Sequence, residues 1–351
     1  MKIERLEVVP YALPFREPYV TARGRLDRRE LLLVRLHAKG LVGLGEAAPL
    51  ALRGGSTLAE IAAELDRCRD VVVGARLLHD PTDLTEACKS AGAGVQALLG
   101  IELAAWDLLG KQDSVPLYRM LEADMRPVRC NATLVAGPPA SVAEHAQRWV
   151  QQGFDTFKLK AGVADDVEQV NAVRAAVPPG SRIRVDANGV WSVDEAAARL
   201  EAMGPLELAE QPVATLGDMR ALRERTDTRL AADESVVTVD DARAAAEVCD
   251  AATVKLAKVG SVHAVFLIAA ELPVYLSSAL DGPVGIAAAA HVAQALPAEL
   301  AHGLATSLLF ADTIASRECV VQGGRLHLTG GPGLGVDIDE AALARCRIAL
   351  S

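Results

Sequence analysis

After Pro127, short apolar runs alternate along the chain with Ala-rich stretches of helical periodicity. Strands that alternate with helices are expected to pair in parallel, because a parallel connection needs a crossover. Eight such runs predict a (β/α) barrel. An open doubly wound sheet is the structural rival, but no GxGxxG motif follows the first run. The predicted runs are 128–135, 156–160, 183–186, 206–210, 229–233, 252–255, 274–278 and 304–310, and the predicted helices include 141–152, 167–176, 192–202 and 240–248.

The first part of the chain has a different texture. Apolar strand-like runs at 3–13, 31–36 and 41–46 precede helical periodicity that begins at Ser56-Thr57 and returns at 93–112. We therefore predict an α+β domain over residues 1–122, a barrel domain over 123–318, and a C-terminal segment, 319–351, that returns to the first domain.

Composition excludes several classes of protein. The 351 residues are 51% hydrophobic and 23% charged, which argues against disorder, and the net charge of −10 argues against a nucleic-acid partner. The longest uncharged run in the C-terminal half, 282–298, is too short to cross a membrane, and the N-terminus has no continuous apolar stretch of a signal peptide. Six dispersed cysteines without a CxxC pair favour a reducing, cytoplasmic location.

Polar residues end most of the predicted barrel strands, at intervals of 22 to 26 residues. In a (β/α) barrel the carboxyl ends of the strands share one face, which holds the active site. We therefore expect these residues to lie in one ring. They are Lys158 and Lys160, Asp186 with Asn188, Glu210, Asp233, Lys255, and Ser277 with Ser278.

The ring predicts metal-assisted acid–base chemistry. Three carboxylates, Asp186, Glu210 and Asp233, suit Mg²⁺, and the absence of histidine at these positions argues against zinc. A lysine near a cation and a second lysine is expected to have a lowered pKa, so it can act as a base. The combination fits removal of a proton α to a carboxylate on a small-molecule substrate.

Several other polar residues are expected to have ordinary structural positions. Glu234 follows Asp233 directly, so on a strand it should face away from the ring. Lys258 is expected behind the site or at the surface, and His291 and His302 in helices or in the core. The Gly-rich segment 330–335 predicts a turn rather than a phosphate loop, because no Lys-Ser/Thr helix follows.

The motifs KLK (158–160), VDAN (185–188), AEQP (209–212), ADES (232–235) and VKLAKVG (254–260) resemble the enolase superfamily, in particular its muconate-lactonizing subgroup. The segments GLGEAAP (43–49) and IELAAWDLLG (101–110) resemble that family's capping domain and the helix leading to its barrel. The resemblance implies a modified TIM-type barrel with an N-terminal α+β capping domain. It also implies Asp186, Glu210 and Asp233 as ligands of one Mg²⁺, with Mn²⁺ as a substitute, Lys160 and Lys255 as acid/base residues, Lys158 as an assisting lysine, and Asn188 as a hydrogen-bonding residue near the metal.

Within the subgroup, segments 23–36 and 274–297 resemble o-succinylbenzoate synthases, which perform a syn-dehydration in menaquinone biosynthesis. N-succinylamino acid racemase, dipeptide epimerase and muconate cycloisomerase activities remain alternatives, as does a non-enzymatic barrel binding protein. Dipeptide epimerases usually carry a DxD pair at the last strand, where this chain has only Asp312. The loop 19–29 and segment 50–57 are expected to cover the barrel mouth. The residues expected to bind the substrate are Tyr19, Arg23 and Arg25, with Asn188, Ser277 and Ser278. A homo-oligomer is compatible with the sequence.

Overall fold

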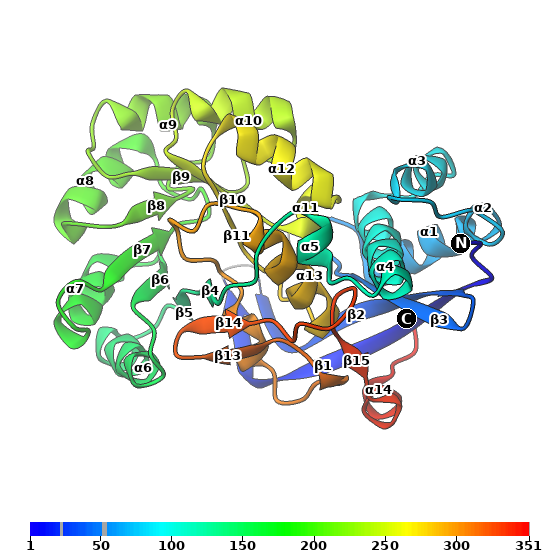
Figure 1. Cartoon of the computed structure of the whole chain (residues 1–351). Helices are drawn as coiled ribbons and strands as arrows, with labels where there is room; N and C mark the ends of the chain where they lie inside the picture. The colour runs from blue at the N-terminus through cyan, green and yellow to red at the C-terminus, as the bar shows by residue number, and fades with distance from the viewer. Residues whose placement is uncertain (22–23, 51–54, 351) are drawn as a thin grey trace.

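The computed structural model describes residues 1–21, 24–50 and 55–350. It has two parts, an N-terminal sheet with its helices and a barrel ringed by helices α6 to α12 (Figure 1). The N-terminal part contains strands β1 (Arg5–Thr21), β2 (Gly24–Ala38) and β3 (Leu41–Ala47), followed by helices α1 (Leu58–Arg67), α2 (Arg69–Val72), α3 (Thr82–Ser90), α4 (Val95–Asp113) and α5 (Leu117–Met120).

The antiparallel sheet β1-β2-β3 is built around one long hairpin. We expect a loop over 19–29, but Tyr19 pairs with Leu26 and Thr21 with Gly24, so β1 extends to Thr21 and β2 begins at Gly24. A turn at Lys39-Gly40 joins β2 to β3, and both residues have positive φ. The predicted helix start is confirmed, since Thr57 and Glu60 form a reciprocal capping box at α1.

The barrel consists of a seven-stranded parallel sheet in the order β11-β10-β9-β8-β7-β6-β5. Its strands are β5 (Ala132–Leu134), β6 (Thr156–Lys160), β7 (Arg182–Asp186), β8 (Leu208–Glu210), β9 (Leu230–Ala232), β10 (Ala251–Val254) and β11 (Val274–Leu276). The helices are α6 (Pro139–Gln151), α7 (Asp166–Ala176), α8 (Val193–Met203), α9 (Leu216–Arg223), α10 (Val239–Ala246), α11 (Leu256–Val259), α12 (Val262–Glu271) and α13 (Pro283–Gln294).

The predicted eighth strand, 304–310, is wrong: Ala305–Leu309 is a 3-10 helix. The preceding residues close the barrel instead. His302 donates its backbone N–H to Arg129 and its backbone oxygen accepts from Asn131, while Gly303 hydrogen-bonds to Leu276 and Ser278 on the other side. The apolar run is used elsewhere, because Phe310 stacks on Phe15 of β1 with ring centroids 5.1 Å apart.

The predicted strand 128–135 is also wrong as a single element. It divides into β4 (Val128–Arg129) and β5, and β4 pairs with β14 in a separate sheet of order β13-β14-β4. The remaining elements are β12 (Ala315–Arg317), β13 (Val320–Gln322), β14 (Arg325–His327), β15 (Asp337–Ile338) and α14 (Glu340–Cys346).

The last described residues lie along β1, the edge strand of the N-terminal sheet. Arg347 bridges Tyr11, and Ile348 donates its backbone N–H to Pro10. Both ends of the chain lie on the side of the molecule that carries α1 to α4 and β3 (Figure 1).

The core is mainly apolar. All six cysteines are buried and form no disulfide. His291 and His302 are also buried, as the sequence predicts for these two histidines. Across the described ranges, no helix combines the length and apolar character that a membrane span requires.

Candidate active site

The carboxyl ends of five parallel strands bring six charged side chains together, which we call the lysine–carboxylate cluster. Lys160, Asp186 and Glu210 are the last residues of β6, β7 and β8, and they occupy matching register positions. Asp233 and Lys255 directly follow β9 and β10, and Lys158 lies two residues before Lys160. The carboxylate residues Asp186, Glu210 and Asp233 are fully buried, and Lys158 and Lys255 are nearly so.

Lys158 lies between two of the carboxylates. Its Nζ is 2.9 Å from Asp186 Oδ2 and 2.6 Å from Glu210 Oε2. Lys160 Nζ is also 2.6 Å from Asp186 Oδ2 and donates to Asn188 Oδ1 at 3.0 Å. Because residues two apart on a strand share a face, both lysines of the KLK motif reach the same carboxylate.

Asp233 is held on several sides. Lys255 Nζ contacts both of its carboxylate oxygens, and Lys258 Nζ contacts its backbone oxygen and Oδ1. Gln211 Oε1 accepts the backbone N–H of Asp233 at 2.9 Å, so the residue after Glu210 orients the next strand end. Lys258 thus contacts a carboxylate of the cluster directly and is not at the surface, since its side chain is 12% exposed. The role of Gln211 was missed, although the AEQP motif contains it.

Glu210 has two carboxylate oxygens in different situations. Oε2 accepts from Tyr275 at 2.7 Å and contacts Lys158, whereas no donor within the described part of the chain reaches the buried Oε1. A buried carboxylate oxygen without a partner is costly, and a bound cation would satisfy it. Three buried carboxylates with an unsatisfied oxygen therefore fit a hard divalent cation in their donor chemistry.

The geometry of the cluster, however, is that of ion pairs. Within residues 1–21, 24–50 and 55–350, no three His, Cys, Asp or Glu side chains lie close enough to hold a metal ion. The lysine ammonium groups contact the oxygen atoms of Asp186, Glu210 and Asp233 directly. Binding of a cation by all three carboxylates would require these ammonium groups to move away.

The charges of the cluster shift the pKa values of Lys158 and Asp186 in opposite directions. Burial acts to lower the pKa of Lys158, but Asp186 and Glu210 outweigh it and raise that pKa well above its usual value. Burial acts to raise the pKa of Asp186, but Lys158 and Lys160 outweigh it and hold the pKa well below its usual range. At Lys158 the carboxylates therefore have the opposite effect to the lowered lysine pKa that the sequence leads us to expect.

The structure corrects the expected orientation of Glu234. Its Oε1 accepts from Asn188 Nδ2 at 3.0 Å, so the side chain points toward the cluster. The two-residue alternation does not apply, because β9 ends at Ala232 and both Asp233 and Glu234 lie beyond the strand. Asn188 links the two sides, since its amide contacts both Lys160 and Glu234.

The predicted substrate-binding residues are only partly brought together. Ser277 and Ser278 follow β11 beside the end of β10, and Ser278 Oγ accepts from the backbone N–H of Asp281. Tyr19 stacks on Phe15 at 5.6 Å, and Arg25 is exposed and pairs with Asp27 at 2.9 Å. No contact found among the described residues joins Tyr19 or Arg25 to the cluster. Arg23, residues 51–54 and part of the predicted covering segments lie outside the described residues.

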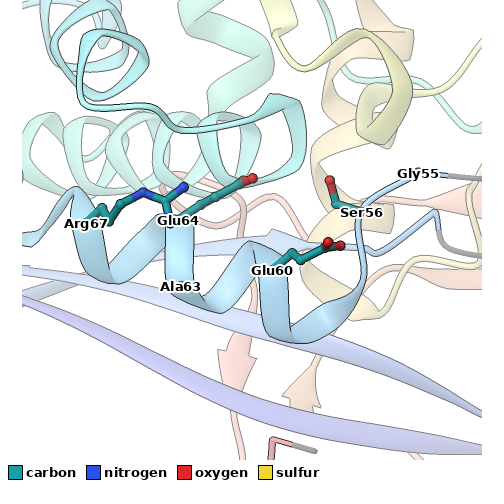
Figure 2. A pocket seen from close by; sticks show the side chains of 6 residues that line it. All are labelled: Gly55, Ser56, Glu60, Ala63, Glu64 and Arg67. Carbon is teal, nitrogen blue, oxygen red and sulfur yellow. The ribbon is translucent and has the colours of Figure 1, made fainter.

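A separate open hollow of about 480 Å³ lies along α1, away from the cluster (Figure 2). Its three charged side chains already have partners: Glu60 caps its own helix, Glu64 accepts from the backbone of Gly94, and Arg67 donates to Gly92. These three side chains are therefore not left free to bind a ligand in the hollow. Its lining residues are Gly55, Ser56, Glu60, Ala63, Glu64 and Arg67.

Comparison with known proteins identifies the family. Residues 141–342 match the model described as "Enolase C-terminal domain-like", and residues 3–121 match "Mandelate racemase / muconate lactonizing enzyme, N-terminal domain". The o-succinylbenzoate synthase of Mycobacterium ulcerans (strain Agy99) is 46% identical over 207 residues, which cover 55% of this chain and 62% of that protein. The match thus spans less than two thirds of this relative.

Two solved structures are similar over nearly the whole chain. The muconate lactonizing enzyme from Pseudomonas fluorescens, complexed with muconolactone, has a TM-score of 0.93 at 27% identity and covers 99% of both chains. The dipeptide epimerase from Enterococcus faecalis V583, complexed with Mg and the dipeptide L-Leu-L-Tyr, has a TM-score of 0.90 at 27% identity and covers 96% of this chain and 100% of its own. The chain described here belongs to the enolase superfamily, and it is an enzyme of that superfamily with a modified TIM barrel and an N-terminal domain of the mandelate racemase and muconate lactonizing type.

Proposed function

We propose that this enzyme is an o-succinylbenzoate synthase, which removes water from a cyclohexadiene carboxylate by syn-dehydration. The observation that carries the proposal is the placement of Lys160 and Lys255 at opposite ends of a row of three buried carboxylates. Their strands, β6 and β10, are separated by β7, β8 and β9 in the sheet, so the two lysines approach from opposite sides of the barrel. The identity to the mycobacterial enzyme of this name supports the choice of substrate.

Asp186, Glu210 and Asp233 would hold one Mg²⁺, and Mn²⁺ is expected to replace it. When bound, the ion would supply positive charge that stabilises the negative charge developing on the substrate carboxylate. Asn188 and Gln211 keep the ligands in place, because Asn188 donates its backbone N–H to Asp186 Oδ1 and Gln211 holds the backbone of Asp233. The unsatisfied Oε1 of Glu210 supports its role as a ligand.

The lysines would move the proton. In a syn-dehydration, Lys160 breaks the C–H bond α to the carboxylate and takes the proton. The same ammonium then returns a proton to the hydroxyl group as its C–O bond breaks, and water leaves. Lys255 remains protonated on the opposite side and stabilises the anion by its charge. Lys158 shares Asp186 Oδ2 with Lys160 and would assist it.

The opposed lysines also suit a second activity, racemisation or epimerisation, in which each lysine serves as a base for one face. The structural likeness to the Enterococcus dipeptide epimerase favours this candidate. Against the dipeptide form, Asp312 is exposed and lies 4.0 Å from Arg345, so it is already paired at the surface. N-succinylamino acids and muconates are therefore the substrates to compare with the cyclohexadiene carboxylate.

The experiment is a substrate screen in D₂O with Mg²⁺, using the o-succinylbenzoate precursor, N-succinylamino acids, dipeptides and muconates. A syn-dehydratase should exchange the α-proton from one face only, and Lys160→Ala should abolish that exchange. A two-base enzyme should exchange from both faces, and Lys255→Ala should leave exchange on one face without racemisation. Full activity of Lys255→Ala would contradict both functions, because each places this lysine against the substrate.

A further inference from the structure

A second set of buried polar groups lies where the N-terminal sheet meets the loop between β11 and α13, residues 277–282. It contains Tyr11, Glu46 and Asp281, which are buried, and Arg29, which is half-buried. This set is separate from the lysine–carboxylate cluster, and the proposed chemistry assigns it no role. One of its members, Asp281, nevertheless hydrogen-bonds to Ser278, which lies with Ser277 just after the end of β11.

Glu46 on β3 caps a helix that belongs to the barrel. Its Oε1 accepts the backbone N–H of Gly282 at 2.7 Å, and its Oε2 accepts the hydroxyl hydrogen of Tyr11 at 2.8 Å. Gly282 is the N-cap of α13 and has no side chain with which to cap the helix itself. A carboxylate at a helix N-terminus satisfies its unpaired N–H groups and interacts favourably with the helix dipole.

The packing at this contact leaves no spare room. A Cβ atom at Gly282 would lie 2.3 Å from the Tyr11 hydroxyl oxygen, and one at Gly285 would lie 2.6 Å from Glu46 Oε1. Both distances are far below van der Waals contact, so the two glycines allow the carboxylate to approach the helix. The position of α13 relative to β3 is therefore closely determined.

Arg29 on β2 holds the other end of the loop. Its guanidinium donates to the backbone oxygen atoms of Pro49 at 2.7 Å, Ala279 at 3.0 Å and Leu280 at 3.2 Å. Leu280 has a φ of 64°, a conformation that a residue with a side chain seldom adopts without support. The guanidinium thus binds the backbone of the N-terminal part at Pro49 and of the barrel loop at Ala279 and Leu280, and Leu280 is the strained residue itself.

Asp281 folds the loop back on itself. Its carboxylate accepts the backbone N–H of Ala279 at 3.1 Å, and its own backbone N–H donates to Ser278 Oγ at 2.8 Å. Ser277, in turn, donates its backbone N–H to Val254, the residue before Lys255. Hydrogen bonds at successive residues of the loop thus connect Arg29 and Glu46 with the serines and with the strand end that carries Lys255.

We propose that Arg29 and Glu46 are positioning residues that fix loop 277–282, and with it Ser277 and Ser278, relative to Lys255, and that they thereby determine which carboxylate substrates the site accepts. The proposal rests on the function proposed above only for the nature of the substrates. Substrate specificity then depends on the contact of Arg29 and Glu46 with loop 277–282, between the N-terminal sheet and the barrel, and not only on side chains that touch the substrate.

The test compares Arg29→Lys and Glu46→Gln with wild-type protein. Lysine keeps the positive charge of Arg29, but its single ammonium nitrogen cannot replace the guanidinium hydrogen bonds to three backbone oxygen atoms. Gln keeps the size of Glu46 and removes its negative charge. Arg28→Lys is the matched control, because Arg28 is its exposed neighbour on β2 and pairs with Glu30 along the same strand. Three quantities are measured: amide hydrogen exchange of residues 277–286, Mg²⁺ affinity by calorimetry, and kcat/KM for two substrates, the o-succinylbenzoate precursor and an N-succinylamino acid.

Loss of a hydrogen bond to a charged group corresponds to roughly a 10- to 100-fold change in a local equilibrium, so exchange in 277–286 should accelerate by about that factor in both variants. The ratio of kcat/KM between the two substrates should change while Mg²⁺ affinity stays within about twofold of wild type. Arg28→Lys should change none of these quantities.

Unchanged exchange in 277–286, or an unchanged substrate ratio in a variant with faster exchange, would overturn the proposal. An equal loss of Mg²⁺ affinity and of both activities would overturn it too, because that pattern indicates general destabilisation. If wild-type protein converts none of the carboxylates, the function proposed above fails, and the substrate ratio is replaced by the ratio of Kd values for the same carboxylates.

Discussion

Tyr275 on β11 donates its hydroxyl hydrogen to Oε2 of Glu210 on β8, 2.7 Å away across the interior of the barrel. Both residues are buried, and the guanidinium carbon of Arg184 lies 4.8 Å from the centre of the tyrosine ring. The hydroxyl group and Lys158 together occupy one oxygen of Glu210, which leaves the other, Oε1, for a cation.

Tyr275→Phe should therefore weaken Mg²⁺ binding by roughly 10- to 100-fold, as expected for loss of a hydrogen bond that orients a metal ligand. Calorimetric titration of the purified protein with Mg²⁺ measures the effect. Tyr118→Phe on α5 is the control, since Tyr118 stacks on His291 instead. Equal affinities of Tyr275→Phe and wild type would show that Glu210 does not depend on this contact.

Mg²⁺ should stabilise the folded protein, because the cation replaces ammonium groups as the partner of three buried carboxylates. At 100 times its Kd, a ligand bound only by the folded state contributes about 2.7 kcal/mol. Thermal melts with EDTA and with increasing Mg²⁺ should show a rising Tm for wild type. In Asp186→Asn, Glu210→Gln and Asp233→Asn the Mg²⁺ dependence should be reduced or absent, and turnover should be lost. A wild-type Tm insensitive to Mg²⁺ would exclude the three carboxylates as its site.

Two arginines of β7 provide a matched pair for the cost of a buried charge. Arg184 is fully buried and contacts Glu207, whereas Arg182 is 43% exposed at its side chain and lies 3.5 Å from the same glutamate. Arg184→Met removes a partner from the largely buried Glu207 and should lower the free energy of unfolding by roughly 3–5 kcal/mol. Arg182→Met should lower it by about 0–1 kcal/mol. Urea unfolding measures both, and similar losses in the two variants would contradict the burial argument.

His302 should make the protein less stable in mild acid. Burial, together with the positive charge of Arg184, lowers the pKa of His302 to about 3, and its Nδ1 accepts the backbone N–H of Leu276. The unfolded chain binds a proton near pH 6.5 and the folded chain does not, so the contribution is present above that pH and is lost as pH falls toward 3.

Between pH 7 and pH 4.5, this difference amounts to about 2.5 kcal/mol of unfolding free energy. His302→Gln, which keeps a hydrogen-bond acceptor, should remove that part of the pH dependence in urea titrations. Exposed His263, replaced by Gln in the same way, is the control. If His302→Gln and wild type lose stability in parallel over this pH range, His302 is not responsible.

The sequence predicted the cluster because its residues follow a period set by the fold. Lys160, Asp186 and Glu210 recur once per strand and helix, and parallel register places such residues side by side. Contacts that cross the barrel have no such period. Tyr275 and Glu210 are three strands apart in the sheet, and nothing in the local sequence connects them.

Glu234 and segment 304–310 were misassigned for another reason. Strand ends are set by tertiary hydrogen bonds, such as those of His302 and Gly303, and the apolar content of a segment does not locate them.

The position of Arg347 and Ile348 along β1 has a consequence for how the protein is made. Until residue 348 has left the ribosome, the N-terminal sheet has an uncovered outer strand at Pro10 and Tyr11. An open strand edge can pair with other chains, and domains near the N-terminus usually fold first during synthesis. For most of its translation, the nascent chain would therefore expose this edge of β1 to pairing with other chains.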